Sequence, residues 1–147
     1  MSVWGTTGNL SKAVKITKVS DYAAANTTDV NATRVDMAGY ESVVFLASIG
    51  TAAANNGVKV QQDTATGMGS AADLEDSQLL SDGTQTEFVV EVYRPRERYV
   101  RLVVERGTST TVEAVWAIQY GTRVLPIDNE TAAQAYELNI EPDEGTA

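Results

Sequence analysis

The stretch EFVVEVYRPRERYVRLVVERGTSTTVEAVWAIQY, residues 87–120, decides the fold. Apolar and polar side chains alternate in three successive runs, which is the pattern of antiparallel strands with one face buried. We therefore expect three neighbouring strands of an antiparallel meander. The side chains expected to face the core are Phe88, Val90, Val92, Val100, Leu102, Val104, Val112, Ala114, Trp116, Ile118 and Tyr120.

Shorter strand patterns flank this stretch on both sides. They lie at residues 11–19, 34–37, 40–49, 58–62, 122–127 and 136–140. Residues 40–49 are apolar on both faces, which indicates a central strand covered on both sides. Pro126 lacks an N–H group, so strand 122–127 is expected at a sheet edge. Residues 71–80 fit either a short helix or a ragged edge strand.

Together these patterns predict an all-β protein, a jelly-roll-like antiparallel β-sandwich with an extended N-terminal arm. A chain of 147 residues is expected to form one domain. The predicted divisions are an arm at residues 1–10, a β-sandwich domain at 11–140, and an acidic tail at 141–147.

The composition excludes several kinds of chemistry. The chain has no Cys and no His, so it can form no thiolate zinc site and no Ser-His-Asp triad. Its net charge of −9 suits nucleic acid poorly, and no apolar run approaches the ~20 residues of a membrane span. Asp73, Glu75 and Asp76 match no Ca²⁺-binding loop and are expected to be a solvated acidic loop. We therefore expect no enzyme activity, no cofactor, no metal ion, no nucleic-acid partner and no membrane partner.

The two ends of the chain carry opposite charge. Lys12 and Lys15 lie near the start, whereas the last twenty residues carry acids and no base. Opposed ends favour contacts between subunits or docking on a charged surface. Two interpretations are open for Trp4: it anchors the arm in a partner, or it folds back onto the core of its own domain.

Four arginines, Arg94, Arg96, Arg98 and Arg101, form the most pronounced basic cluster. Alternate arginines at a strand end could project together and grip carboxylate or phosphate groups. Glu91 and Glu97 lie among them and could instead absorb the charge in salt bridges. The cluster is thus either a structural or intersubunit ion-pair network or an anion- or partner-binding surface.

Three segments carry a resemblance to a known family: MAGYESVVFLASIG (37–50), YRPRERYVRLVVERG (93–107) and AIQYGTRVLP (117–126). With VWGTTGNLSKAVKITK at 3–18 and the closing EGTA, the chain resembles the head decoration, or cement, proteins of tailed bacteriophages. The resemblance covers most of the chain and rests on structural patterns, so it supplies no set of catalytic residues.

The resemblance implies a small, β-rich, oligomeric protein on the outer surface of the capsid. Its partners would be the phage major capsid protein and further copies of itself, as a dimer or trimer. The alternatives are a tail or head–tail joining protein, and a carbohydrate-binding β-sandwich that would use Tyr22, Tyr40, Tyr93 and Tyr136. From the residues themselves, the candidate partner contacts are Trp4, Lys12, Lys15, Arg94, Arg96, Arg98 and Arg101.

Overall fold

The computed structural model describes residues 8–146, and within them the chain is mostly β, with antiparallel strands and one short helix. The elements are α1 (Leu10–Ala13), β1 (Lys15–Ser20), β2 (Ala23–Asn26), β3 (Val30–Asn31), β4 (Val35–Asp36), β5 (Ser42–Ser48), β6 (Asn56–Asp63), β7 (Ala72–Asp73), β8 (Leu79–Leu80), β9 (Glu87–Tyr93), β10 (Tyr99–Arg106), β11 (Thr110–Val112) and β12 (Val115–Tyr120).

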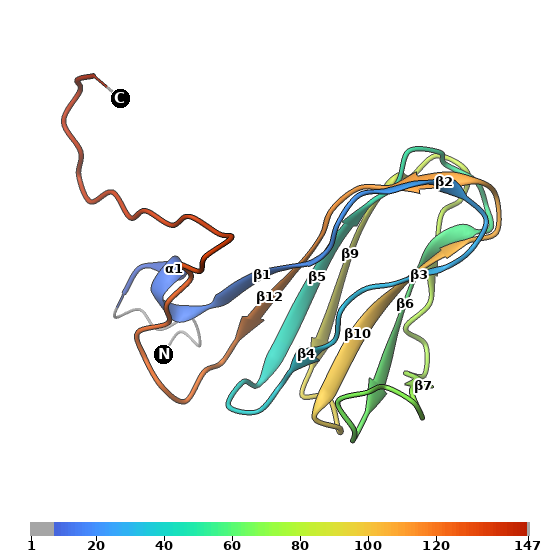
Figure 1. Cartoon of the computed structure of the whole chain (residues 1–147), viewed down its shortest axis with the longest axis horizontal. Helices are drawn as coiled ribbons and strands as arrows, with labels where there is room; N and C mark the ends of the chain where they lie inside the picture. Colours follow the sequence, from blue (N-terminus) through green and yellow to red (C-terminus); the bar gives the residue numbers. More distant parts are fainter. Residues whose placement is uncertain (1–7, 147) are drawn as a thin grey trace.

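The strands form two large sheets and one small one (Figure 1). The first sheet has four strands in the order β1-β12-β5-β9. The second has the order β3-β10-β6-β7, with β4 also paired to β10 and β8 also paired to β6. Strands β2 and β11 pair with each other. The C-terminal segment leads away from the sheets on the side where α1 lies.

The strand pairs are nested along the chain. β1 pairs with β12, β2 with β11, β3 and β4 with β10, β5 with β9, and β6 with β7 and β8. The chain therefore doubles back on itself as one long ribbon. Two further pairings, β12 with β5 and β10 with β6, close this ribbon into the two sheets.

The inner faces of the two large sheets share one hydrophobic core. Phe45 of β5 and Leu102 of β10 are its largest fully buried side chains, and valines from both sheets surround them. Burying a side chain of this size stabilises the fold by about 1.5–3 kcal/mol. The core thus holds the two sheets together, and the outer face of each sheet is left for other contacts.

The expected meander is wrong. β9 pairs with β5 in the first sheet, β10 pairs with β6 in the second, and β12 lies between β1 and β5. Strand β9 ends where Arg94 takes a left-handed backbone conformation (φ 54°), and the chain then passes to the other sheet. The alternation of apolar and polar residues correctly predicts the buried faces of β9 and β10. It does not predict which strand each of them pairs with.

The predicted orientation of β12 is also wrong. Val115, Ala117 and Gln119 face the core, whereas Trp116, Ile118 and Tyr120 lie on the opposite face and are half-buried. Both faces of this strand are apolar apart from Gln119. The sequence therefore predicts that the face with Gln119 is the outer one, because a polar side chain is expected to face solvent. Gln119 is buried because its Nε2 donates to the Asp36 carbonyl oxygen at 2.8 Å.

Two of the predicted strands do not form. Residues 122–127 and 136–140 contain neither helix nor strand, and the predicted strand at 11–19 begins only at Lys15, after α1. The C-terminal segment instead binds β1 through side chains. Asn129, which is 2% exposed, accepts from the Ile16 N–H at 2.8 Å and donates to the Val14 and Ser11 carbonyls at 3.0 and 2.7 Å.

Other strand predictions are confirmed with small shifts. The patterns at 34–37 and 58–62 correspond to β4 and β6, and β5 is a central strand of its sheet. Its outer face, however, is only partly covered, since Leu46 is 37% exposed. Residues 71–80 form the short edge strands β7 and β8. Gly57 permits β8 to pair with β6, because a Cβ there would lie 2.2 Å from the Leu79 carbonyl oxygen.

Candidate protein interface

The outer face of the first sheet carries apolar side chains on all four strands, with Lys18 of β1 and Glu91 of β9 at the two ends of the same rows. Register places Trp116 beside Leu46 and Leu46 beside Val89, and in the next row Ile16 beside Ile118 and Ile118 beside Val44. We call these six residues the apolar face. Val89 is 65% exposed, and the other five are half-buried or exposed. An exposed apolar patch that is bordered by polar residues is typical of a protein contact site.

The outer face of the second sheet is polar, and its side chains bind one another. We call the group Lys59, Gln61, Asp73, Gln78, Arg101 and Glu105 the polar face. Lys59 Nζ lies 3.0 Å from Asp73 Oδ2, and Arg101 donates twice to Gln61 Oε1, at 2.9 and 2.7 Å. Gln78 Nε2 donates to Glu105 Oε2 at 2.8 Å.

Hydrogen bonds within the polar face shift two pKa values. The Gln61 amide and the Lys59 ammonium hold the pKa of Asp73 below its usual value. The hydrogen bond to Asp73 raises the pKa of Lys59. Both charges are therefore stabilised by partners within the chain, and this face is already satisfied without a partner.

The structure separates the predicted arginine cluster into unconnected pairs. Arg94 Nε donates to Glu41 Oε1 at 2.7 Å, and Arg98 binds Asp36 through two hydrogen bonds of 2.9 Å. The bond from Arg98 lowers the pKa of Asp36, and the bonds from Arg94 and then Tyr93 lower the pKa of Glu41. Arg94 and Arg98 thus form ion pairs within the chain, with Glu41 and Asp36 in place of the predicted Glu91 and Glu97.

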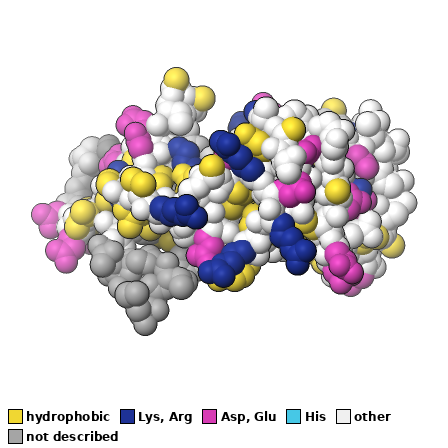
Figure 2. Space-filling model, turned by 90° about the horizontal axis from the view of Figure 1, so that it is seen from below, with side chains coloured by type: hydrophobic (Ala, Val, Ile, Leu, Met, Phe, Trp, Pro, Cys, Tyr) yellow, Lys and Arg dark blue, Asp and Glu magenta, His cyan; other side chains and the backbone are white. Residues whose placement is uncertain are grey.

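The other two arginines behave differently. Arg101 belongs to the polar face, bound to Gln61. Arg96 is exposed and has no ion pair or hydrogen bond among the described residues. Figure 2, which shows the molecule from below, has basic side chains in separate groups, with hydrophobic and acidic side chains between them. The face seen in this view therefore has no continuous basic patch.

Lys12 and Lys15 contact the C-terminal segment. The Lys12 ammonium lies 4.5 Å from the centre of the Tyr136 ring, and Lys15 Nζ donates to the Asp128 carbonyl oxygen at 2.8 Å. Ser11 Oγ and the Tyr136 hydroxyl lie 2.7 Å apart, and Gln134 Nε2 donates to the Ile16 carbonyl at 3.0 Å. These two lysines thus help to fasten the end of the chain to its start.

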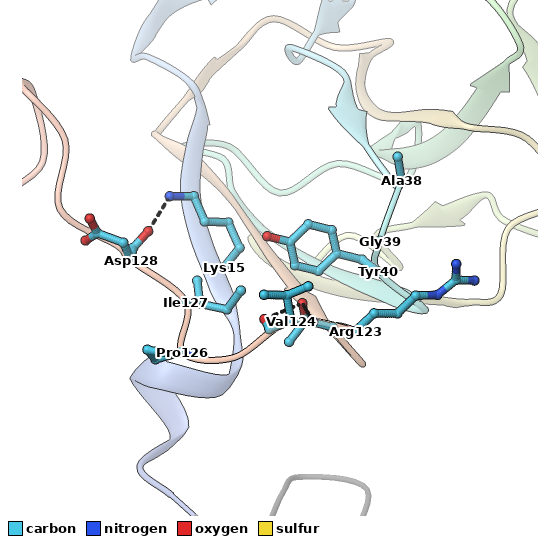
Figure 3. Close-up of a pocket in the computed structure, with 10 residues that line it drawn as sticks. Lys15, Ala38, Gly39, Tyr40, Arg123, Val124, Pro126, Ile127 and Asp128 are labelled. Atoms are coloured by element: carbon cyan, nitrogen blue, oxygen red, sulfur yellow. Dashed lines mark hydrogen bonds between the residues drawn. The ribbon is translucent and has the colours of Figure 1, made fainter.

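A shallow pocket lies beside Lys15 (Figure 3). Tyr40, Val124 and Ile127 line it, and Lys15 and Arg123 lie on opposite sides of the Tyr40 ring. Burial raises the pKa of Tyr40. Because Lys15 is already bound to the Asp128 carbonyl and Arg123 is exposed, the pocket has an apolar wall but no convergent set of polar groups.

Several predicted features are not brought together. Trp4 and most of the predicted arm lie outside the described residues. Residues 141–146 form an exposed segment without helix or strand. The four tyrosines of the carbohydrate-binding alternative lie on four separate segments, and Tyr136 is engaged by Lys12 and Ser11.

The sequence interpretation missed the apolar face and the role of Asn129. Trp116 and Ile118 are predicted to face the core, and Val44 and Leu46 to lie on a strand covered on both sides, because a half-exposed apolar side chain and a core side chain give the same pattern. Val89 offers a signal, since it lies between Phe88 and Val90 of the predicted core face. Nothing in the sequence around Asn129 indicates that its amide lies beside a strand more than a hundred residues away.

Among residues 8–146, no helix is long and apolar enough to span a membrane, and no group of three or more acidic side chains is placed to hold a metal ion. Comparison of the sequence with models of known families, and with curated proteins, finds no significant match.

Proposed function

We propose that the protein is a non-enzymatic virion component that decorates a tailed-phage capsid on its outer surface and bridges major capsid subunits. The observation that carries the proposal is the apolar face: six apolar residues adjoin one another across the outer surface of the first sheet, while the opposite outer surface is satisfied by its own hydrogen bonds. This asymmetry favours a protein that docks one side on a partner. The resemblance supplies the kind of partner.

The strand order supports a jelly-roll interpretation of the fold. Nested pairs of one folded ribbon, distributed over two sheets, are the arrangement of jelly rolls, which are common among viral structural proteins. The lack of His and Cys supports a role without catalysis, since the commonest general base and the strongest nucleophile are missing.

In this proposal the apolar face lies against the capsid. Trp116 at its centre is the side chain expected to contribute most to binding, because buried aromatic groups dominate most interfaces. The exposed Arg96 and the acids of the C-terminal segment lie outside the apolar face and contribute a salt-dependent part of the attraction.

The test is co-sedimentation of purified protein with undecorated heads. Leu46→Glu places a charge in the middle of the apolar face and is expected to weaken binding by at least tenfold. Ala65→Glu adds the same charge in the exposed loop after β6 and is the matched control, with binding unchanged. Equal binding of the two variants would refute the apolar face as the capsid contact.

Copy number separates this proposal from the tail or head–tail joining alternative. A decoration protein is expected to approach the number of major capsid subunits in purified virions. A joining protein forms a ring and would be present in about a dozen copies. Quantitative gel analysis of virions, against the major capsid band, decides between the two.

A further inference from the structure

We propose that β9 is a dimerisation edge: two copies of the chain pair through β9, antiparallel and about a two-fold axis, to form one continuous eight-stranded sheet. The inference rests on the backbone of β9 and its neighbours. It does not depend on the capsid being the partner of the apolar face.

One side of β9 has open backbone groups. β5 binds the backbone of Phe88, Val90 and Val92, because the flanking bonds from Ile49 N to Thr86 O and from Arg94 N to Glu41 O fix the alternation of the ladder. The N–H and C=O groups of the alternate residues therefore point away from β5. Those residues are Glu87, Val89, Glu91 and Tyr93, and among residues 8–146 no hydrogen bond reaches these groups.

The other edges of the two large sheets are protected. β1, at the opposite edge of the first sheet, is covered at Ile16 by the side chains of Asn129 and Gln134. The strands at the margins of the second sheet, β3, β4, β7 and β8, have two residues each. β9 has seven residues, with no Pro, no Lys and no bulge. Natural proteins block long open edges by such devices, so an unblocked edge indicates a pairing site.

The sequence of β9 suits pairing with itself. A two-fold axis at Val90 places Glu87 opposite Tyr93 of the second copy, and Val89 opposite Glu91 of the second copy. In this register all four open residues of each copy are bonded, which gives about eight hydrogen bonds. Shifting the register by two residues leaves one open residue of each copy without a partner.

Charge is also compatible with the antiparallel arrangement. β9 begins with the acid Glu87 and is followed by Arg94 and by Arg96, which has no ion pair within residues 8–146, so antiparallel copies bring acid and base together at both ends. Glu91 is drawn back over its own sheet, because the Tyr120 hydroxyl donates to its Oε2 at 2.8 Å. The two Glu91 carboxylates are therefore held away from the shared edge.

A groove beside the same edge would be filled by the second copy. It lies between β9 and residues 74–79, and its apolar lining includes Leu74, Leu79, Val90 and Val92. Leu79 is 44% exposed in the single chain. In the proposed dimer Val90 and Val92 of the second copy continue the inner surface of the first sheet along this groove, which covers these apolar side chains. The dimer also places two apolar faces side by side.

Disulfide trapping tests the register, because the chain has no cysteine of its own. Val90→Cys places residue 90 opposite itself at a Cα separation of about 4.5 Å, within disulfide range. Val89→Cys is the matched control: it is more exposed, yet the two copies of residue 89 lie diagonally at about 7–8 Å. We expect cross-linked dimer from Val90→Cys at low micromolar concentration and at least tenfold less from Val89→Cys.

A second variant tests the edge without cysteine. Val89→Pro removes an N–H that β5 does not use and should convert a dimer to a monomer in sedimentation, with unchanged circular dichroism. A wild-type monomer or trimer, or stronger cross-linking of Val89→Cys than of Val90→Cys, would overturn the proposal. If Val89→Pro fails to fold, the cysteine pair alone decides. Capsid binding is measured separately, so the failure of one proposal leaves the other standing.

Discussion

The two large sheets share a core but differ in what they present to solvent. The polar face is closed on itself: Lys59, Gln61 and Asp73 bind one another, and Arg101 binds Gln61. The apolar face has Trp116, Leu46 and Val89 in one cross-strand row. These side chains form no hydrogen bonds with one another, and their contact with water is unfavourable. Both sheets contribute one side of the core. Of their two outer surfaces, the apolar face is the one whose burial by a partner would lower the free energy.

The largest expected effect is a difference in stability between two variants of β5, one in the core and one on the apolar face. Phe45→Ala is expected to lower the free energy of unfolding by about 3–5 kcal/mol, because Phe45 is fully buried between the sheets. Leu46→Ala, the adjacent residue with its side chain on the outer face, is expected to cost less than about 1 kcal/mol. Urea denaturation of both variants measures the difference, and equal losses would contradict the assignment of the two faces.

The next effect concerns the edge of the first sheet opposite β9. Asn129→Ala leaves the Ile16 N–H and the Val14 carbonyl without partners and is expected to cost about 2 kcal/mol. Hydrogen exchange of the Ile16 amide should accelerate in this variant. Glu130→Ala, at an exposed neighbouring position, is the control and should leave exchange unchanged.

Three aspartates should make stability depend on pH, and Asp73 is the one that belongs to the polar face. The pKa values of Asp36, Asp63 and Asp73 are lowered in the folded chain, so each contributes stability above the ordinary carboxyl pKa of about 4 and loses it as the pH falls through the native value. The melting temperature should therefore fall mainly below pH 4. Asp73→Asn should reduce this dependence, whereas Asp143→Asn, in the exposed tail, should not.

The smallest effect is expected at the arginine pairs. Arg98 and Asp36 are both about half exposed, so Arg98→Ala is expected to cost less than about 1 kcal/mol. A double-mutant cycle with Asp36→Ala isolates the pair. A coupling energy well above 1 kcal/mol would show that this pair, rather than the core, orients the chain between β9 and β10.

The parts of the fold that the sequence could predict are those in which one face is clearly polar. β10 was assigned correctly for Val100, Leu102 and Val104, because Arg101 and Glu105 mark the other face. β12 was assigned the wrong way round, because Trp116 and Ile118 are as apolar as Val115 and Ala117. Of the candidate contacts, Arg94 binds Glu41, the residue before β5, and Arg98 binds Asp36 of β4, and neither acid could be predicted as a partner from its place in the sequence.

The sequence by itself determined that the chain is rich in short strands, acidic, and without the side chains of the commonest catalytic and metal sites. It determined this because composition and alternation are local properties. Only the tertiary structure decided which strands pair, which face of β12 is buried, and which edges stay open. Those features depend on residues far apart in the chain: β1 lies beside β12, and Asn129 closes the edge at Ile16. Partners for backbone and side chains are assigned only when the whole ribbon closes.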